Sequence, residues 1–132
     1  MTRKPQKPTA SELEILHVLW SRGASTVREV QDALNQKKDM GYTGVLKLLQ
    51  IMTVKGLVRR DESQRAHVYD ACRPAEQTKR QLAADMLQRV FEGSASQLMM
   101  HALAGHRASP QEIEELHRVL DAYREDDDDG AE

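Results

Sequence analysis

The apolar residues in the first half of the chain recur every three or four positions, which is the spacing of helices with one buried side. Two of these helices can begin with a capping box, in which a hydroxyl residue is followed three positions later by glutamate. Either Thr9 or Ser11 can cap the first helix in this way, and Thr26 can cap the second. Because Gly23 and Gly56 are expected to end the first and third helices, the predicted ranges are about 9–22, 26–38 and 43–55.

The third predicted helix, 43–55, has two unlike sides. Its buried stripe is expected to consist of Val45, Leu48, Leu49 and Met52, which follow the i, i+3, i+4, i+7 pattern. The opposite side is expected to remain uncovered, and it carries Thr43, Lys47, Gln50 and Val54, with Leu46 and Ile51 at its edges.

After the third helix the pattern alternates with a period of two, which predicts two short strands at 57–62 and 66–70 joined by a polar hairpin. Three helices followed by such a hairpin are the element order of a winged helix-turn-helix. The predicted fold class is mostly α with a small β-hairpin wing. The predicted organisation is a flexible basic arm at 1–8, a winged-helix DNA-binding domain at 9–73, a helical dimerisation region at 74–124 and a disordered acidic tail at 125–132.

The region 74–124 returns to helical spacing and carries wide apolar faces. A small winged-helix domain cannot cover these faces alone, so they are expected to interlock across a two-fold axis in a homodimer. The residues expected at this interface are Leu82, Met86, Val90, Leu98, Ile113, Leu116 and Leu120.

Charge is distributed unevenly along the chain. Residues 1–73 hold 13 Lys and Arg against 8 Asp and Glu, a balance of +5, whereas residues 74–132 hold 6 against 13, a balance of −7. A basic front favours a polyanionic partner. Aromatic residues make up only 4% of the chain, which argues against a base-stacking platform for single strands. No apolar run reaches the roughly 20 residues that span a bilayer, so we expect a cytoplasmic protein without membrane insertion.

The exposed side of the helix 43–55 fits the major groove of double-stranded DNA. Lys47 could bind guanine or a phosphate, and Gln50 could pair with adenine. Thr43, at the start of the helix, could hold a phosphate together with free backbone N–H groups. The wider set expected to contact DNA is Thr43, Gly44, Lys47, Gln50, Ile51, Lys55 and the wing residues Arg59, Arg60 and Arg65.

A different class of function also fits the pattern, namely a winged-helix adaptor that binds another protein without specific DNA affinity. Enzyme activity is not expected, because the chain has neither a glycine-rich phosphate loop nor a nucleophile elbow. Cys72 is the only cysteine, and the five histidines lack the spacing of a metal site. We therefore expect no cofactor and no metal.

Five stretches of the chain carry a resemblance to a known family: 13–16 with Trp20, 26–30, 42–49, 55–58 and 109–116. In this order they resemble the penicillinase-repressor family of bacterial transcriptional regulators, the BlaI/MecI/CopY type. The resemblance implies a homodimer with an N-terminal winged helix and C-terminal dimerisation helices, which represses promoters at palindromic operators. In the antibiotic-resistance members, a membrane sensor-protease pathway leads to cleavage in the dimerisation region and releases the DNA.

The sequence departs from that family in the helix that reads DNA. Gly44 and Lys47 replace two usual threonines, and Ile51 stands where arginine is common. Hydrogen-bonding groups are thereby lost at three expected readout positions, although Lys47 adds a cation. The apolar residues Leu46, Ile51 and Val54 could meet thymine methyl groups, or they could make binding weaker and less specific.

Two further departures concern regulation. The resistance members are cleaved at an asparagine–phenylalanine pair, and His101-Ala102 falls at that place here. The copper-sensing branch ends in a cysteine-rich metal motif, which this sequence lacks. The operator sequence, the inducing signal and the mode of release therefore do not follow from the resemblance.

Overall fold

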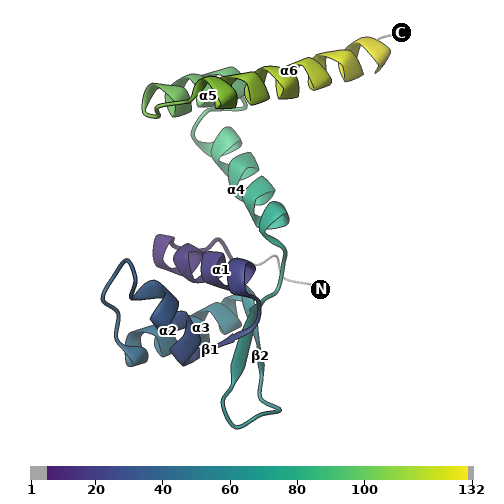
Figure 1. Cartoon of the computed structure of the whole chain (residues 1–132). Helices are drawn as coiled ribbons and strands as arrows, with labels where there is room; N and C mark the ends of the chain where they lie inside the picture. Colours follow the sequence, from purple (N-terminus) through teal and green to yellow (C-terminus); the bar gives the residue numbers. More distant parts are fainter. Residues whose placement is uncertain (1–5, 131–132) are drawn as a thin grey trace. The chain divides into compact units, whose positions relative to one another are not determined.

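A computed structural model describes residues 6–130 of the chain. These residues form two compact units, which divide between Ala84 and Asp85 (Figure 1). In chain order the elements are α1 (Ala10–Arg22), β1 (Ser25–Thr26), α2 (Val27–Leu34), α3 (Tyr42–Lys55), β2 (Val58–Asp61), β3 (Val68–Ala71), α4 (Ala75–Arg89), α5 (Ala95–Ala104) and α6 (Pro110–Gly130).

The N-terminal unit is a winged helix: three helices and a small antiparallel sheet of strand order β1-β3-β2. The predicted hairpin is confirmed, because β2 pairs with β3 from Val58 opposite Ala71 to Asp61 opposite Val68. The strand β1 was not predicted. It comprises only two residues, which pair with β3 near Tyr69, and two residues are too few to show an alternating pattern.

Local hydrogen bonds set the ends of the helices. The hydroxyl of Thr9 accepts from the backbone N–H of Glu12, while the Glu12 carboxylate accepts from the N–H of Thr9, so the capping box at Thr9 is confirmed. Thr26 and its partner glutamate form the same reciprocal pair at the start of α2. At the other end of α3, Gly56 adopts the left-handed conformation with φ +80°, which allows the chain to turn directly into β2.

The buried apolar core lies entirely in the N-terminal unit. From α3 it receives Val45, Leu49 and Met52, which are fully covered, whereas Leu48 is only partly buried. The ring of Tyr69 from β3 is also buried and packs into the same cluster. One side of α3 is therefore held against the core and the other side is not.

The residues that follow β3 show the opposite situation. After Tyr69, none of the side chains that the structure describes is buried. Large apolar side chains are instead exposed, among them Val90 at 65% and Leu120 at 60%. Within residues 6–130 no helix is long and apolar enough to cross a membrane.

The C-terminal end of the chain differs from the sequence-based expectation. The acidic tail was predicted to be disordered from residue 125, but α6 continues to Gly130, since extending an existing helix is far easier than starting one. Residues 131–132, and residues 1–5 of the predicted arm, lie outside the described residues. In the remainder of the arm, the N–H of Gln6 donates to the carbonyl of Lys55 at 3.4 Å.

Candidate DNA interface

The uncovered side of α3 is the most distinctive surface of the N-terminal unit. Lys47 and Gln50 are exposed there, and Val54 lies in the same row with 89% of its surface exposed. Thr43 and Gly44 are also exposed, at the start of the helix. The structure thus places these sequence-predicted residues on one continuous side, which no other part of the N-terminal unit buries.

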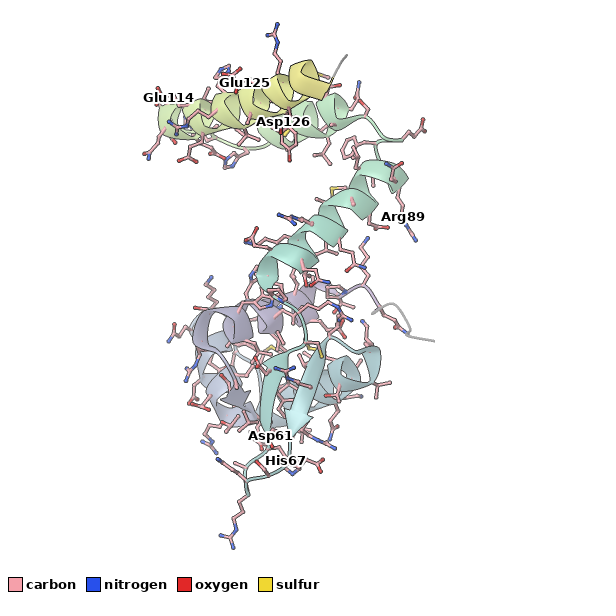
Figure 2. The ribbon with its side chains drawn as sticks, turned by 90° about the vertical axis from the view of Figure 1, so that its right-hand side faces the viewer. Asp61, His67, Arg89, Glu114, Glu125 and Asp126 are labelled. Carbon is pink, nitrogen blue, oxygen red and sulfur yellow. The ribbon has the colours of Figure 1, made fainter. Side chains whose placement is uncertain are left out.

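An open groove runs between this side of α3, the start of α2 and the wing. Tyr42, Leu46 and Gln50 line it from α3, and Arg28 lines it from α2. The wing contributes two arginines, and His67 stands just before β3. Figure 2 shows His67 and Asp61 close together at the outer end of the wing strands. The cationic residues that line the groove are Arg28, Arg60 and Arg65.

The cations of this surface differ in how far they are neutralised. Arg59 lies 3.5 Å from Asp70, and Arg60 forms an ion pair with Glu62. Among the side chains that the structure describes, no carboxylate forms an ion pair with Arg28, Lys47 or Arg65. These three charges are therefore free to attract an external anion.

Lys55 does not belong to this surface, which corrects the sequence-based expectation. Its Nζ lies 2.5 Å from Oε1 of Glu12, and the two side chains are only 13% and 3% exposed. Burial alone would raise the pKa of Glu12, but hydrogen bonds from Lys55 and Thr9 more than offset it and hold that pKa below its ordinary value. The ammonium of Lys55 thus ties α3 to the start of α1 and is not available to a phosphate.

Further hydrogen bonds hold the end of α3 in place. The guanidinium of Arg73 donates to the carbonyl of Gly56 at 3.0 Å. The carbonyl of Arg73 in turn accepts from the indole N–H of Trp20 at 3.0 Å. The exit from the wing, the end of α3 and α1 are therefore joined at one point, which fixes the orientation of the exposed side of α3 within its unit.

Among the residues that line the groove, Arg28, Tyr42 and His67 were not identified from the sequence as DNA contacts. Arg28 follows the cap of α2, and only the packing of α2 beside α3 brings it to the groove. In the sequence, Arg28 could have been recognised as a candidate by its position on the polar side of a short capped helix. Tyr42 was expected to precede the third helix, whereas α3 begins with it.

Comparisons with known proteins find relatives over most of the chain. The family model of the penicillinase repressor matches residues 8–122. The transcriptional regulator BlaI of Mycobacterium tuberculosis is 32% identical over 111 residues, which is 83% of this chain and 79% of that protein. The methicillin resistance regulatory protein MecI of Staphylococcus aureus (strain N315) is 19% identical over 120 residues, covering 91% and 98% of the two chains.

Among solved structures, the chain is similar to the monomeric form of Bacillus licheniformis BlaI in complex with the blaP half-operator. That similarity has a TM-score of 0.49 at 20% identity and covers 57% of this chain and 92% of the other. The assignment itself comes from the family model and the 32% identical relative, which both extend over most of the sequence. The chain therefore belongs to the penicillinase repressor family.

Proposed function

We propose that this chain is a homodimeric transcriptional repressor that binds a palindromic DNA operator through the exposed side of α3. One observation carries the proposal. The row of α3 that contains Lys47 and Gln50 is uncovered, and it stands beside a groove in which Arg28 and Arg65 have no carboxylate partner among the described side chains. A polar helix face framed by unpaired cations is complementary to the major groove and its flanking phosphates.

The dimensions of α3 suit one operator half-site. From Thr43 to Val54 the exposed row rises by eleven residue steps, or about 16 Å of helix, which matches roughly four or five base pairs. Lys47 is suited to guanine or a phosphate, and Gln50 to adenine. Thr43 lies in the first turn of α3, where free backbone N–H groups favour a phosphate. Gly44 and Ile51 lie beside them, and Arg28, Arg59, Arg60 and Arg65 would add attraction to the backbone.

The dimer is proposed because the C-terminal helices leave their apolar residues uncovered. A groove between α5 and α6 is lined almost wholly by apolar side chains, including Met99, Leu103 and Leu116. A single half-site supplies little affinity, whereas two copies of α3 about one helical turn of DNA apart, roughly 34 Å, multiply affinity and specificity. The residues proposed for the interface are Leu82, Met86, Val90, Leu98, Ile113, Leu116 and Leu120.

Repression would follow from occlusion of RNA polymerase in the cytoplasm, where a bacterial promoter lies. Release would follow from any event that separates the C-terminal helices. A membrane sensor-protease pathway could act here only by cutting a bond other than the family's asparagine–phenylalanine pair, since His101 and Ala102 stand at that place. Both residues are exposed on α5.

The test is a salt titration of binding to the DNA upstream of the protein's own coding sequence, with a random duplex of equal length as the control. A specific repressor should prefer the upstream fragment and weaken steeply with salt. In that assay Lys47→Ala and Gln50→Ala should lose preference for the fragment, while His17→Ala, at an exposed position of α1 that does not line the groove, should not. Equal and weak binding to both duplexes would instead support the protein-binding adaptor.

A further inference from the structure

The exposed side of α3 contains an apolar patch formed by Ile51 and Val54. Val54 is 89% exposed and Ile51 is 41% exposed. A single exposed apolar side chain is ordinary on a protein surface. Gln50, however, follows Lys47 by three positions and Val54 follows Gln50 by four, so Val54 belongs to the row that is proposed to face DNA.

Nothing within the described residues explains the patch. The α3 residues that pack into the core are Val45, Leu49 and Met52, with Leu46 and Leu48 packed against it. Neither Ile51 nor Val54 belongs to this cluster or to the residues that pack against it. Both are β-branched and so form helix less readily than lysine, arginine or glutamate would. The free protein thus gains little from Val54, and the exposed apolar surface of both side chains becomes useful when a partner covers it.

The charges around the patch indicate which partner this is. Lys47 lies in the same row and Arg28 and Arg65 line the adjacent groove, so the occupant must be polyanionic. In the major groove of duplex DNA the one apolar feature of a base pair is the 5-methyl group of thymine. The branched ends of isoleucine and valine are suited to that group, and they offer nothing to the hydrogen-bonding edges of guanine or cytosine.

We propose that Ile51 and Val54 recognise thymine methyl groups in the operator half-site, within about two base pairs of an adenine bound by Gln50. The spacing follows from the helix, because the four residues from Gln50 to Val54 rise about 6 Å and one base pair occupies about 3.4 Å. This specificity rests on the proposed DNA-binding function. Apolar contact would take the place of hydrogen-bonded readout at these positions. The preferred operator is therefore expected to be rich in A·T pairs at that end of the half-site.

The experiment first selects the preferred half-site from random duplexes with the full-length protein. Each thymine of the selected site is then replaced, one at a time, by deoxyuridine, which lacks only the 5-methyl group. Binding is measured by fluorescence anisotropy. We expect about a fourfold loss of affinity at one or two adjacent thymines, equivalent to about 0.8 kcal/mol at 1.4 kcal/mol per tenfold. Deoxyuridine in the flanking DNA should change nothing.

Matched variants assign each methyl group to a side chain. Val54→Ala, which removes both γ-methyl groups, should bind the thymine and deoxyuridine sites equally at one position, while Val54→Ile should keep the preference. Ile51→Ala should remove the preference at the other position.

Three results would overturn the inference. In the first, the selected half-site holds no thymine at this spacing. In the second, no deoxyuridine weakens DNA binding by the unaltered protein more than about twofold. This measurement needs no variant, and the proposed repressor function would survive such a result. In the third, the preference persists in both alanine variants. A protein that selects no sequence at all would overturn the proposed function together with the inference.

Discussion

The ion pair between Glu12 and Lys55 gives a prediction that can be worked out from the structure. The two side chains are almost covered, and Nζ lies 2.5 Å from Oε1. Lys55→Met keeps most of the aliphatic stem but leaves the carboxylate buried without its cation. Removing one partner of a buried pair costs about 3–5 kcal/mol. Because the N–H of Thr9 still donates to this carboxylate, we expect a loss somewhat below that range, about 2–3 kcal/mol in the free energy of unfolding at neutral pH.

The pH dependence of this loss follows from the pKa of Glu12. In the unaltered chain that pKa lies below the ordinary value of 4.5, so the pair's contribution to stability is complete above pH 4.5 and is lost as the pH falls through the lower, folded-state pKa. In Lys55→Met, burial is no longer offset by the ammonium, so we expect the pKa of Glu12 to rise. The deficit of the variant should therefore grow as the pH rises from the folded-state pKa of Glu12 in the unaltered chain, below 4.5, to the higher pKa of the variant, and it should shrink in acid.

The assay is urea unfolding followed by the fluorescence of Trp20, the single tryptophan of the chain, which reports on the N-terminal unit. The matched control is the double variant Glu12→Gln/Lys55→Met, which holds no charge at this place. It should recover most of the free energy of unfolding that Lys55→Met loses, and its remaining deficit should not change with pH. A deficit below about 0.5 kcal/mol in Lys55→Met, unchanged between acid and neutral pH, is what an exposed pair would give and would refute the reasoning.

Three other predictions concern separate surfaces. Arg65→Ala should weaken binding to all duplexes alike and reduce the slope of log affinity against log salt by about one, measured by anisotropy at several salt concentrations; a selective loss for the operator would contradict a phosphate contact. Gly44→Ala should stabilise the protein by about 0.5–1 kcal/mol in thermal unfolding, since a Cβ at that position meets no atom within 4 Å; a lower midpoint would contradict the open surface there. Leu116→Asp should yield single chains in sedimentation experiments and lose operator binding, whereas a stable dimer would disprove the proposed interface.

The features that the sequence predicted well depend on residues close together in the chain. The capping pairs at Thr9 and Thr26, the glycine that ends α3 and the buried stripe of α3 all follow from spacings of a few residues. The hairpin was predictable for the same reason. The exposed side of α3 could be identified because it is the complement of that stripe.

The features that were missed depend on residues far apart in the chain. Lys55 was assigned to DNA because nothing local shows that Glu12, 43 positions earlier, would bind it. Arg28 joins the groove only through the packing of α2 beside α3, and β1 exists only because β3 returns beside it. Neither the sequence nor the structure of the free chain shows which DNA groups the proposed contact residues bind, because those contacts form only in a complex with DNA.

The absence of buried side chains from the described part of the C-terminal helices has a consequence for gene control. Helices that lack a core of their own gain much of their order on association, so assembly of the proposed dimer follows mass action. While most of the protein is monomeric, halving its concentration would lower the amount of dimer about fourfold. A promoter under such a repressor would respond to small changes in repressor synthesis more steeply than one guarded by a monomer.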